Sequence, residues 1–250
     1  MLSFNNVSFT YPGDIGPIME NLSFSVAQGD FISIIGASGC GKSTIFRLIN
    51  GLEKPEKGSI TIDDTPIEKL HNYSSFMPQK DLLFPWHSVR KNVCLPMELA
   101  RIPKSERKSR CLDVLKNAGL TDYADKMPHE LSGGMRQRVS FARTLLAGAD
   151  MLLLDEPFSA LDYLTKINMQ EWLLQQWEHY NKSILFITHD VEEAIFLSKT
   201  IFVIRSVPFR SMDEISVPLP YPRRREDLAT QPIIELREKL FESLRKERVK

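Results

Sequence analysis

The sequence predicts an α/β fold with a largely parallel sheet, because short apolar runs alternate with helical patterns. The apolar runs have the length and composition of strands that are covered on both faces, and they span residues 31–35, 74–77, 151–154, 183–188 and 201–204. Helical patterns separate the later runs, at residues 135–147, 164–179 and 192–198. This alternation is typical of parallel strands joined by helices.

The first part of the chain has a different pattern. Residues 7–11 alternate between apolar and polar side chains, and residues 22–26 repeat the alternation before a turn at residues 28–30. Such alternation indicates half-buried strands. We therefore expect a small antiparallel β layer beside the parallel sheet.

A glycine-rich loop follows the run at 31–35. Its sequence fits G-x-x-x-x-G-K-[ST], a pattern whose backbone N–H groups surround the phosphates of a nucleotide, and its residues are Gly36, Ala37, Ser38, Gly39, Cys40, Gly41, Lys42, Ser43 and Thr44. A helix is expected from Lys42 to about Asn50, with Gly51 at its C-terminal end. In this pattern Lys42 contacts the β- and γ-phosphates of ATP and Ser43 is a Mg²⁺ ligand.

Two further motifs lie downstream. Leu131 is followed by Ser132, Gly133 and Gly134, where the serine can cap a helix and the glycines permit a close backbone approach. The run at 151–154 ends in Asp155 and Glu156. A strand here would deliver both carboxylates to the edge of the sheet at which ligands of open α/β sheets bind.

Taken together, these motifs resemble those of the ATP-binding-cassette (ABC) ATPases, in order and without gaps from about Leu2 to about Ile204. The resemblance implies a P-loop NTPase core, a small N-terminal antiparallel β layer and an inserted helical subdomain at about 81–135. A helical segment that opens at 103–106 and closes at Gly119 agrees with such a subdomain. We expect one ATPase domain over residues 1–222, then a basic linker and an amphipathic helix over residues 223–250.

The resemblance also implies the roles of individual residues. Glu156 occupies the position of the general base, Asp155 belongs to the Mg²⁺ shell, and His189 matches the switch histidine that contacts the γ-phosphate. Gln79 resembles the glutamine that touches Mg²⁺ and the attacking water. Tyr11 corresponds to the aromatic residue that stacks on adenine, with Phe9 as the alternative.

The motif at 131–134 implies a dimer, because one ATP in the loop at 36–44 needs no second anion site in the same chain. In the family this motif closes on ATP that is bound by a second copy. A membrane permease and, indirectly, a substrate-binding protein are the other partners that the resemblance implies. We expect the chain to lie at the cytoplasmic face of the membrane, since no signal peptide is apparent and its apolar runs are too short to span a bilayer.

Lysine plus arginine equals aspartate plus glutamate at 32 each, so the charge balance does not favour a nucleic-acid partner. The three cysteines, Cys40, Cys94 and Cys111, are isolated in the sequence and lack metal-ligand spacing. A disulfide framework is therefore not expected.

Local matches at 81–86 and 219–225 are similar to the nitrate/sulfonate/taurine branch of ABC importers, whereas 206–210 departs from the turn usual in that branch. The expected substrate is a small organic or inorganic anion. A thiamine-precursor pyrimidine importer is one alternative. Alternatives from other classes are a soluble ABC ATPase without a transport role and a regulatory module without turnover.

Two surface features leave alternatives open. Trp86 belongs either to a groove that receives a permease helix or to the core of the helical subdomain. Arg223, Arg224 and Arg225 either touch anionic headgroups or form a solvated linker with Glu226 and Asp227, and the linker is the favoured interpretation.

Overall fold

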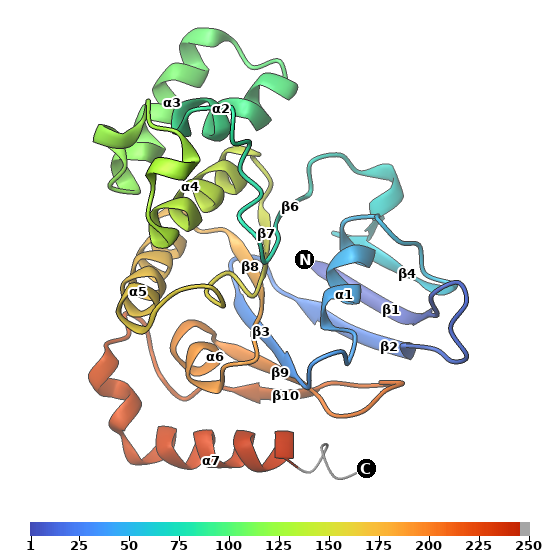
Figure 1. Ribbon diagram of the computed structural model, residues 1–250. Helices are drawn as coiled ribbons and strands as arrows, with labels where there is room; N and C mark the ends of the chain where they lie inside the picture. The colour runs from blue at the N-terminus through green and yellow to red at the C-terminus, as the bar shows by residue number, and fades with distance from the viewer. Residues whose placement is uncertain (246–250) are drawn as a thin grey trace. The chain divides into compact units, whose positions relative to one another are not determined.

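The structure, a computed structural model, describes residues 1–245 (Figure 1). The chain forms two compact units. The first consists of residues 1–73 together with the chain from Tyr180 onward, and the second of residues 74–179. Within residues 1–245, no helix combines the length and apolarity that crossing a membrane would require.

The first unit contains two groups of strands. One is antiparallel, in the order β2-β1-β4-β5, with β1 (Leu2–Phe9), β2 (Met19–Val26), β4 (Lys57–Ile62) and β5 (Thr65–Pro66). The other has the order β10-β9-β3-β8, with β3 (Phe31–Gly36), β8 (Ser183–Ile187), β9 (Thr200–Ile204) and β10 (Asp213–Ser216). In this second group β8, β3 and β9 are parallel and β10 is antiparallel.

Aromatic side chains join these two groups of strands. The ring of Phe24 on β2 stacks on Phe4, with centroids 4.4 Å apart, and meets Phe202 on β9 edge-on at 5.5 Å. Phe4 and Phe202 are both buried. The antiparallel layer is thus packed against the parallel strands through these aromatic contacts.

The helices of the first unit cover the parallel strands. They are α1 (Lys42–Ile49), α6 (Val191–Leu197) and α7 (Gln231–Arg245), with short 3₁₀ turns η1 (Ile67–Lys69) and η4 (Arg225–Ala229). In Figure 1, α7 runs beside α6 at the end of the chain. Its apolar stripe, Ile233, Leu236 and Leu240, lies in one buried cluster with Ile35 and Val203 of the strands. The rest of the tail for which a helix was predicted, residues 246–250, lies outside the described residues.

The second unit is mainly helical. Its strands β6 (Ser74–Met77) and β7 (Met151–Asp155) pair in parallel. Its helices are α2 (Val89–Leu99), α3 (Lys104–Asn117), α4 (Gly133–Leu146) and α5 (Tyr163–Tyr180), with 3₁₀ turns η2 (Thr121–Tyr123) and η3 (Pro128–Glu130). Helix α2 packs against both α3 and α4.

The predicted fold class is confirmed: parallel strands, an N-terminal antiparallel layer and a helical part are all present. One helix and three strands were not predicted, namely α2, β4, β5 and β10. Helix α2 contains Pro96, which signals a break, and β10 carries no regular alternation. These elements form because neighbouring elements offer partners for them, which local sequence does not reveal.

The favoured interpretation of the basic cluster was wrong for Arg223. This residue is only 6% exposed. Its guanidinium donates hydrogen bonds at 2.8–3.2 Å to carbonyl oxygens of Leu219, Ile195, Phe196 and Ser198. The last three lie at the C-terminal end of α6, where carbonyl groups lack helical partners. Arg223 therefore caps a helix and is not part of a solvated linker.

Candidate active site

The glycine-rich loop at 36–44 lies in the first unit, between the end of β3 and the start of α1. Gly41 is the N-cap of α1 with φ 95°, a conformation that favours glycine. Lys42 begins the helix and is 6% exposed. Its Nζ donates to the carbonyl oxygens of Gly36 at 2.9 Å and Ala37 at 2.8 Å. The lysine thus folds back over its own loop.

Two residues that sequence reasoning missed support this loop from behind. A Cβ atom at Gly41 would lie 2.4 Å from Cγ2 of Ile18 and 3.2 Å from Cε1 of Phe209. Phe209 is buried, and its N–H donates to the carbonyl of Ile18 at 3.1 Å. Gly41 is therefore required by close packing as well as by its dihedral angle. Phe209 lies far along the chain in a segment without a motif, so no sequence signal indicated it.

Tyr11 lies beside the first turn of α1. Its hydroxyl is 3.2 Å from Oγ1 of Thr44, and the guanidinium of Arg47 lies 5.9 Å from its ring centroid. Phe9, the alternative aromatic residue, is 3% exposed and meets the Tyr11 ring edge-on. Phe9 is thus part of the core, and Tyr11 is the partly exposed aromatic residue at this loop.

The loop fits a phosphate group and its cation. The ammonium group of Lys42 is buried, yet within residues 1–245 no carboxylate lies at ion-pair distance from it. Its positive charge adds to the unpaired N–H groups at the N-terminus of α1, which together favour an anion. Ser43, one residue along, is exposed and can present its hydroxyl to a metal ion. ATP and Mg²⁺ therefore match the residues present.

His189 also belongs to the first unit. It is exposed and follows β8 and Thr188. Asp190 caps α6, accepting hydrogen bonds from the N–H groups of Glu192 at 2.9 Å and Glu193 at 3.3 Å. Thr188 accepts from the Asp190 N–H at 3.0 Å and donates to the Glu193 carboxylate. Thr188 thus links Asp190 to Glu193, and these contacts fix the backbone on both sides of His189.

The second unit carries the acidic pair and the glutamine. Asp155 ends β7, and Glu156 follows it with φ 45°, an unfavourable value for a residue with a side chain. Backbone strain of this kind gathers at functional sites. Nε2 of Gln79 donates to Oε2 of Glu156 at 3.4 Å and to Oγ of Ser159 at 3.3 Å. The structure thus brings Gln79 and Glu156 together.

The glycine-rich motif at 131–134 begins α4 in the same unit. Ser132 is the N-cap, and its Oγ accepts from the Met135 N–H at 3.3 Å. A Cβ atom at Gly134 would lie 2.5 Å from Cγ2 of Thr165, so packing against α5 already requires glycine there. Gly133 is more open, and it lines a cavity of about 540 Å³ together with Gln79.

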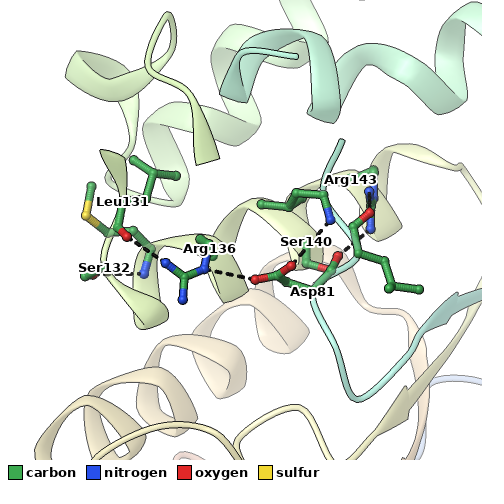
Figure 2. A network of polar contacts seen from close by, with 9 residues as sticks. Asp81, Leu131, Ser132, Arg136, Ser140 and Arg143 are labelled. Carbon is green, nitrogen blue, oxygen red and sulfur yellow. Dashed lines mark hydrogen bonds and ion pairs between the residues drawn. The ribbon is translucent and has the colours of Figure 1, made fainter. Parts of the chain in front are cut away.

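Figure 2 shows a polar network that connects this motif to the segment after Gln79. Arg136 donates to the carboxylate of Asp81 at 3.0 Å and to the carbonyl of Leu131 at 2.8 Å. Arg143 donates to the carbonyls of Asp81 and Leu82, each at 2.8 Å. Burial lowers the pKa of Arg143, and Asp81 opposes this effect. No sequence motif predicted this network.

The predicted site residues therefore fall into two groups. The first unit carries Tyr11, the loop at 36–44 and His189; the second carries Gln79, Asp155, Glu156 and the motif at 132–134. A strand, a glycine-rich loop with a buried lysine, and a helix define a nucleotide-binding protein of the P-loop class.

Comparisons with known proteins narrow this class. A family model described as "ABC transporter" matches residues 19–159. The chain is 40% identical over 222 residues to a putative ATP-binding protein of Brucella abortus, which covers 89% of this chain and 85% of that protein. It is 40% identical over 226 residues to the formylaminopyrimidine import ATP-binding protein ThiZ of Halalkalibacterium halodurans, with 90% and 88% covered. It is 39% identical over 236 residues to the nitrate import ATP-binding protein NrtD of Synechococcus elongatus, with 92% and 86% covered.

A solved structure agrees with these relatives. The ATP-binding cassette MJ0796, described as a dimer in a post-hydrolysis state bound to ADP and Pi, superposes with a TM-score of 0.73 at 28% identity. The match covers 88% of this chain and all of that one. The chain belongs to the ABC transporter family, and the predicted resemblance to ABC ATPases is confirmed.

Proposed function

We propose that this chain is the ATP-binding and ATP-hydrolysing subunit of an ABC import system, in which ATP-driven closure of a homodimer is coupled to transport through a separate permease. The observation that carries the proposal is that Lys42 is buried in its loop without a carboxylate partner among the described residues. The chain is also similar, over most of its length, to proteins named as import ATP-binding proteins.

The first unit binds the nucleotide in this proposal. The loop at 36–44 offers N–H groups to the phosphates, and Lys42 turns from its two carbonyl partners toward them. Ser43 would hold a Mg²⁺ ion, which would supply positive charge beside the phosphates. Tyr11 supplies a face on which adenine stacks, a contact worth about 1–3 kcal/mol per base.

The remaining site residues position and activate the water molecule that attacks the γ-phosphate of ATP. Glu156 removes its proton as general base, and His189 orients it against the γ-phosphate. Gln79 would contact both the Mg²⁺ ion and the attacking water. Asp155 would be a ligand of the Mg²⁺ ion. Support comes from the strained backbone of Glu156 and its hydrogen bond with Gln79, because both restrict where the carboxylate can point.

Two copies of the chain build the complete site. Ser132 is exposed at the N-terminus of α4, and this end of a helix favours an anion. We assign Ser132, Gly133 and Gly134 to the γ-phosphate of ATP held by the second copy. The description of MJ0796 as a dimer supports this arrangement for a cassette of the same family.

The permease binds at Trp86, at the cytoplasmic face of the membrane. Trp86 is 67% exposed, which excludes the alternative that it belongs to a core. Its ring lies 5.5 Å from that of Phe84 and 6.1 Å from that of His87. Exposed aromatic clusters of this kind mark interaction surfaces. A substrate-binding protein delivers the solute to the permease.

The transported solute is a small anion in this proposal, of the nitrate/sulfonate/taurine type. The relative named for nitrate import supports it. The relative named for formylaminopyrimidine import favours a second candidate, a pyrimidine precursor of thiamine. Transport by the purified complex in vesicles, with labelled nitrate and a labelled formylaminopyrimidine in parallel, separates the two.

Co-expression with candidate permeases tests the import role. The chain should co-purify with a multi-span membrane protein, and Trp86→Ala should weaken the association without unfolding the isolated subunit. Leu112→Ala, at another exposed apolar residue of the same unit, is the matched control and should leave the association intact. Equal association of both variants would contradict docking at Trp86.

A further inference from the structure

Two cysteines that are isolated in the sequence line the same recess in the structure. Cys94 lies on α2 and Cys111 on α3, two helices that pack together. Sγ of Cys111 lies 3.8 Å from the carbonyl oxygen of Arg90, one helical turn before Cys94. The two thiols lie close enough for each to change the pKa of the other. Both residues are free thiols, Cys111 buried and Cys94 partly exposed.

Both thiols line a recess of about 250 Å³ that is rich in positive charge. Four basic side chains, Arg90, Lys104, Arg107 and Lys108, share its lining with one acidic residue, Glu98. Glu98 pairs with Arg107 at 2.7 Å, and Arg90 pairs with Asp125 at 3.0 Å. The lining of the recess therefore keeps an excess of positive charge.

Arg107, one of the residues that line the recess, also carries an unused hydrogen-bond donor. Nε of Arg107 is buried and has no hydrogen-bond partner among the described residues. A buried donor without a partner costs free energy. Within residues 1–245, Lys104 and Lys108 form no ion pair. The two unpaired ammonium groups suit a ligand that carries carboxylates.

We propose that Cys94 and Cys111 form a thiol–disulfide exchange site that reacts with a small disulfide carrying carboxylate groups. The thiolate of Cys94 attacks one sulfur of the disulfide, giving a mixed disulfide on Cys94 and releasing one small thiolate. The deprotonated Cys111 then attacks Sγ of Cys94, forming the Cys94–Cys111 disulfide and releasing the second small thiol. Two protein thiols are oxidised and one small disulfide is reduced to two thiols.

The environment assigns the order of attack. The hydrogen bond from Cys111 lowers the pKa of Cys94, and the charges of Arg107 and Arg90 act in the same direction against burial and Glu98. The pKa of Cys111 is raised, first by its hydrogen bond to Cys94 and then by burial. Cys94 is thus the accessible nucleophile, and Cys111 reacts after Cys94 has been modified. This inference needs neither ATP nor a permease, so it stands independently of the proposed function.

Oxidised glutathione, an anionic disulfide, is a suitable probe for the reduced full-length protein. Peptide mapping by mass spectrometry should find a Cys94–Cys111 cross-link, with the loss of two of the three thiols in the chain. Cys111→Ser should stop at glutathione attached to Cys94. Cys94→Ser should leave Cys111 reduced, which also reports that Cys111 stays buried in a folded chain.

Two comparisons can overturn the proposal. In the urea-unfolded protein the environment is lost, so the cross-link should form more slowly; equal or faster formation there would show that the fold contributes nothing. Cystamine, a cationic disulfide, should react more slowly than oxidised glutathione with the folded protein. The Lys104→Gln/Lys108→Gln variant should reduce that difference. If cystamine reacts as fast with the unsubstituted protein, the recess does not select an anionic ligand.

Discussion

Nε of Arg136 lies 3.0 Å from Oδ2 of Asp81, which joins the helix that begins at Ser132 to the segment that follows Gln79. Arg143, two turns further along α4, holds the backbone of the same segment through the carbonyls of Asp81 and Leu82. Leu82 has φ 43°, a strained value for a leucine. Such strain persists only where surrounding contacts impose it. The two arginines therefore fix the position of the chain just after Gln79.

The two arginines should differ in their effect on stability. Arg143→Ala removes two charged hydrogen bonds to main-chain carbonyls, so the free energy of unfolding should fall by about 2–4 kcal/mol. Arg136 forms a partly exposed ion pair with Asp81 and donates one hydrogen bond to the Leu131 carbonyl, so Arg136→Ala should cost about 1–2 kcal/mol. Urea denaturation measures both. A larger loss for Arg136→Ala would contradict the assignment of the main support to Arg143.

Arg223 should be a strong determinant of stability although it lies in a basic cluster. Arg223→Ala leaves the carbonyl groups at the end of α6 without a donor and should lower the free energy of unfolding by about 3 kcal/mol. Arg223→Lys should recover only part, because an ammonium lacks the planar fork of donors. Its neighbour Arg224 is exposed, so Arg224→Ala is the matched control with an expected change within about 0.5 kcal/mol. Similar losses for Arg223→Ala and Arg224→Ala would refute the helix-cap role.

Strong local patterns allowed the sequence to predict the parallel strands and the loop at 36–44. The buried strands are runs of consecutive, mostly apolar residues, and the loop has glycines and a lysine at a fixed spacing. Contacts between distant residues could not be predicted in this way. Phe209 behind Gly41, Arg223 at the end of α6 and Arg143 at Asp81 are side chains of ordinary types. Their roles depend on tertiary packing, and no local pattern encodes it.

Cys94 should react with iodoacetamide at a lower pH than an ordinary cysteine does. Its pKa is lowered in the folded protein, chiefly by the hydrogen bond from Cys111, so the reactive thiolate is already present below the usual range. Cys111→Ala removes this hydrogen bond, and the pH profile should shift upward toward that of the urea-unfolded chain. Peptide mapping after brief alkylation gives the rate at each pH. If the pH profile of Cys94 alkylation is unchanged in Cys111→Ala, Cys111 does not lower the pKa of Cys94, and the charges of Arg90 and Arg107 account for the shift.

Mixed dimers test whether each site is composite. Lys42→Ala should disable the loop, and Ser132→Arg should place bulk where the γ-phosphate of the second copy docks. Each variant alone carries its defect in both sites and should trap no nucleotide. In a mixed dimer both defects fall in one site, and the other site pairs an intact Lys42 with an intact Ser132. Nucleotide trapping should therefore return on mixing, and its absence at every ratio would indicate sites built within one chain.

ATP hydrolysis by Glu156→Gln tests the central claim most directly. The substitution keeps the shape of the side chain but removes the general base. The purified variant should therefore bind ATP as before and hydrolyse it roughly 10²–10⁴-fold more slowly than the unsubstituted protein. Glu178→Gln, the same change at an exposed residue of the same unit, should hydrolyse ATP at the unsubstituted rate. Steady-state release of phosphate at saturating ATP and Mg²⁺ is the measurement, and a rate for Glu156→Gln equal to that of Glu178→Gln would contradict the proposed function of Glu156.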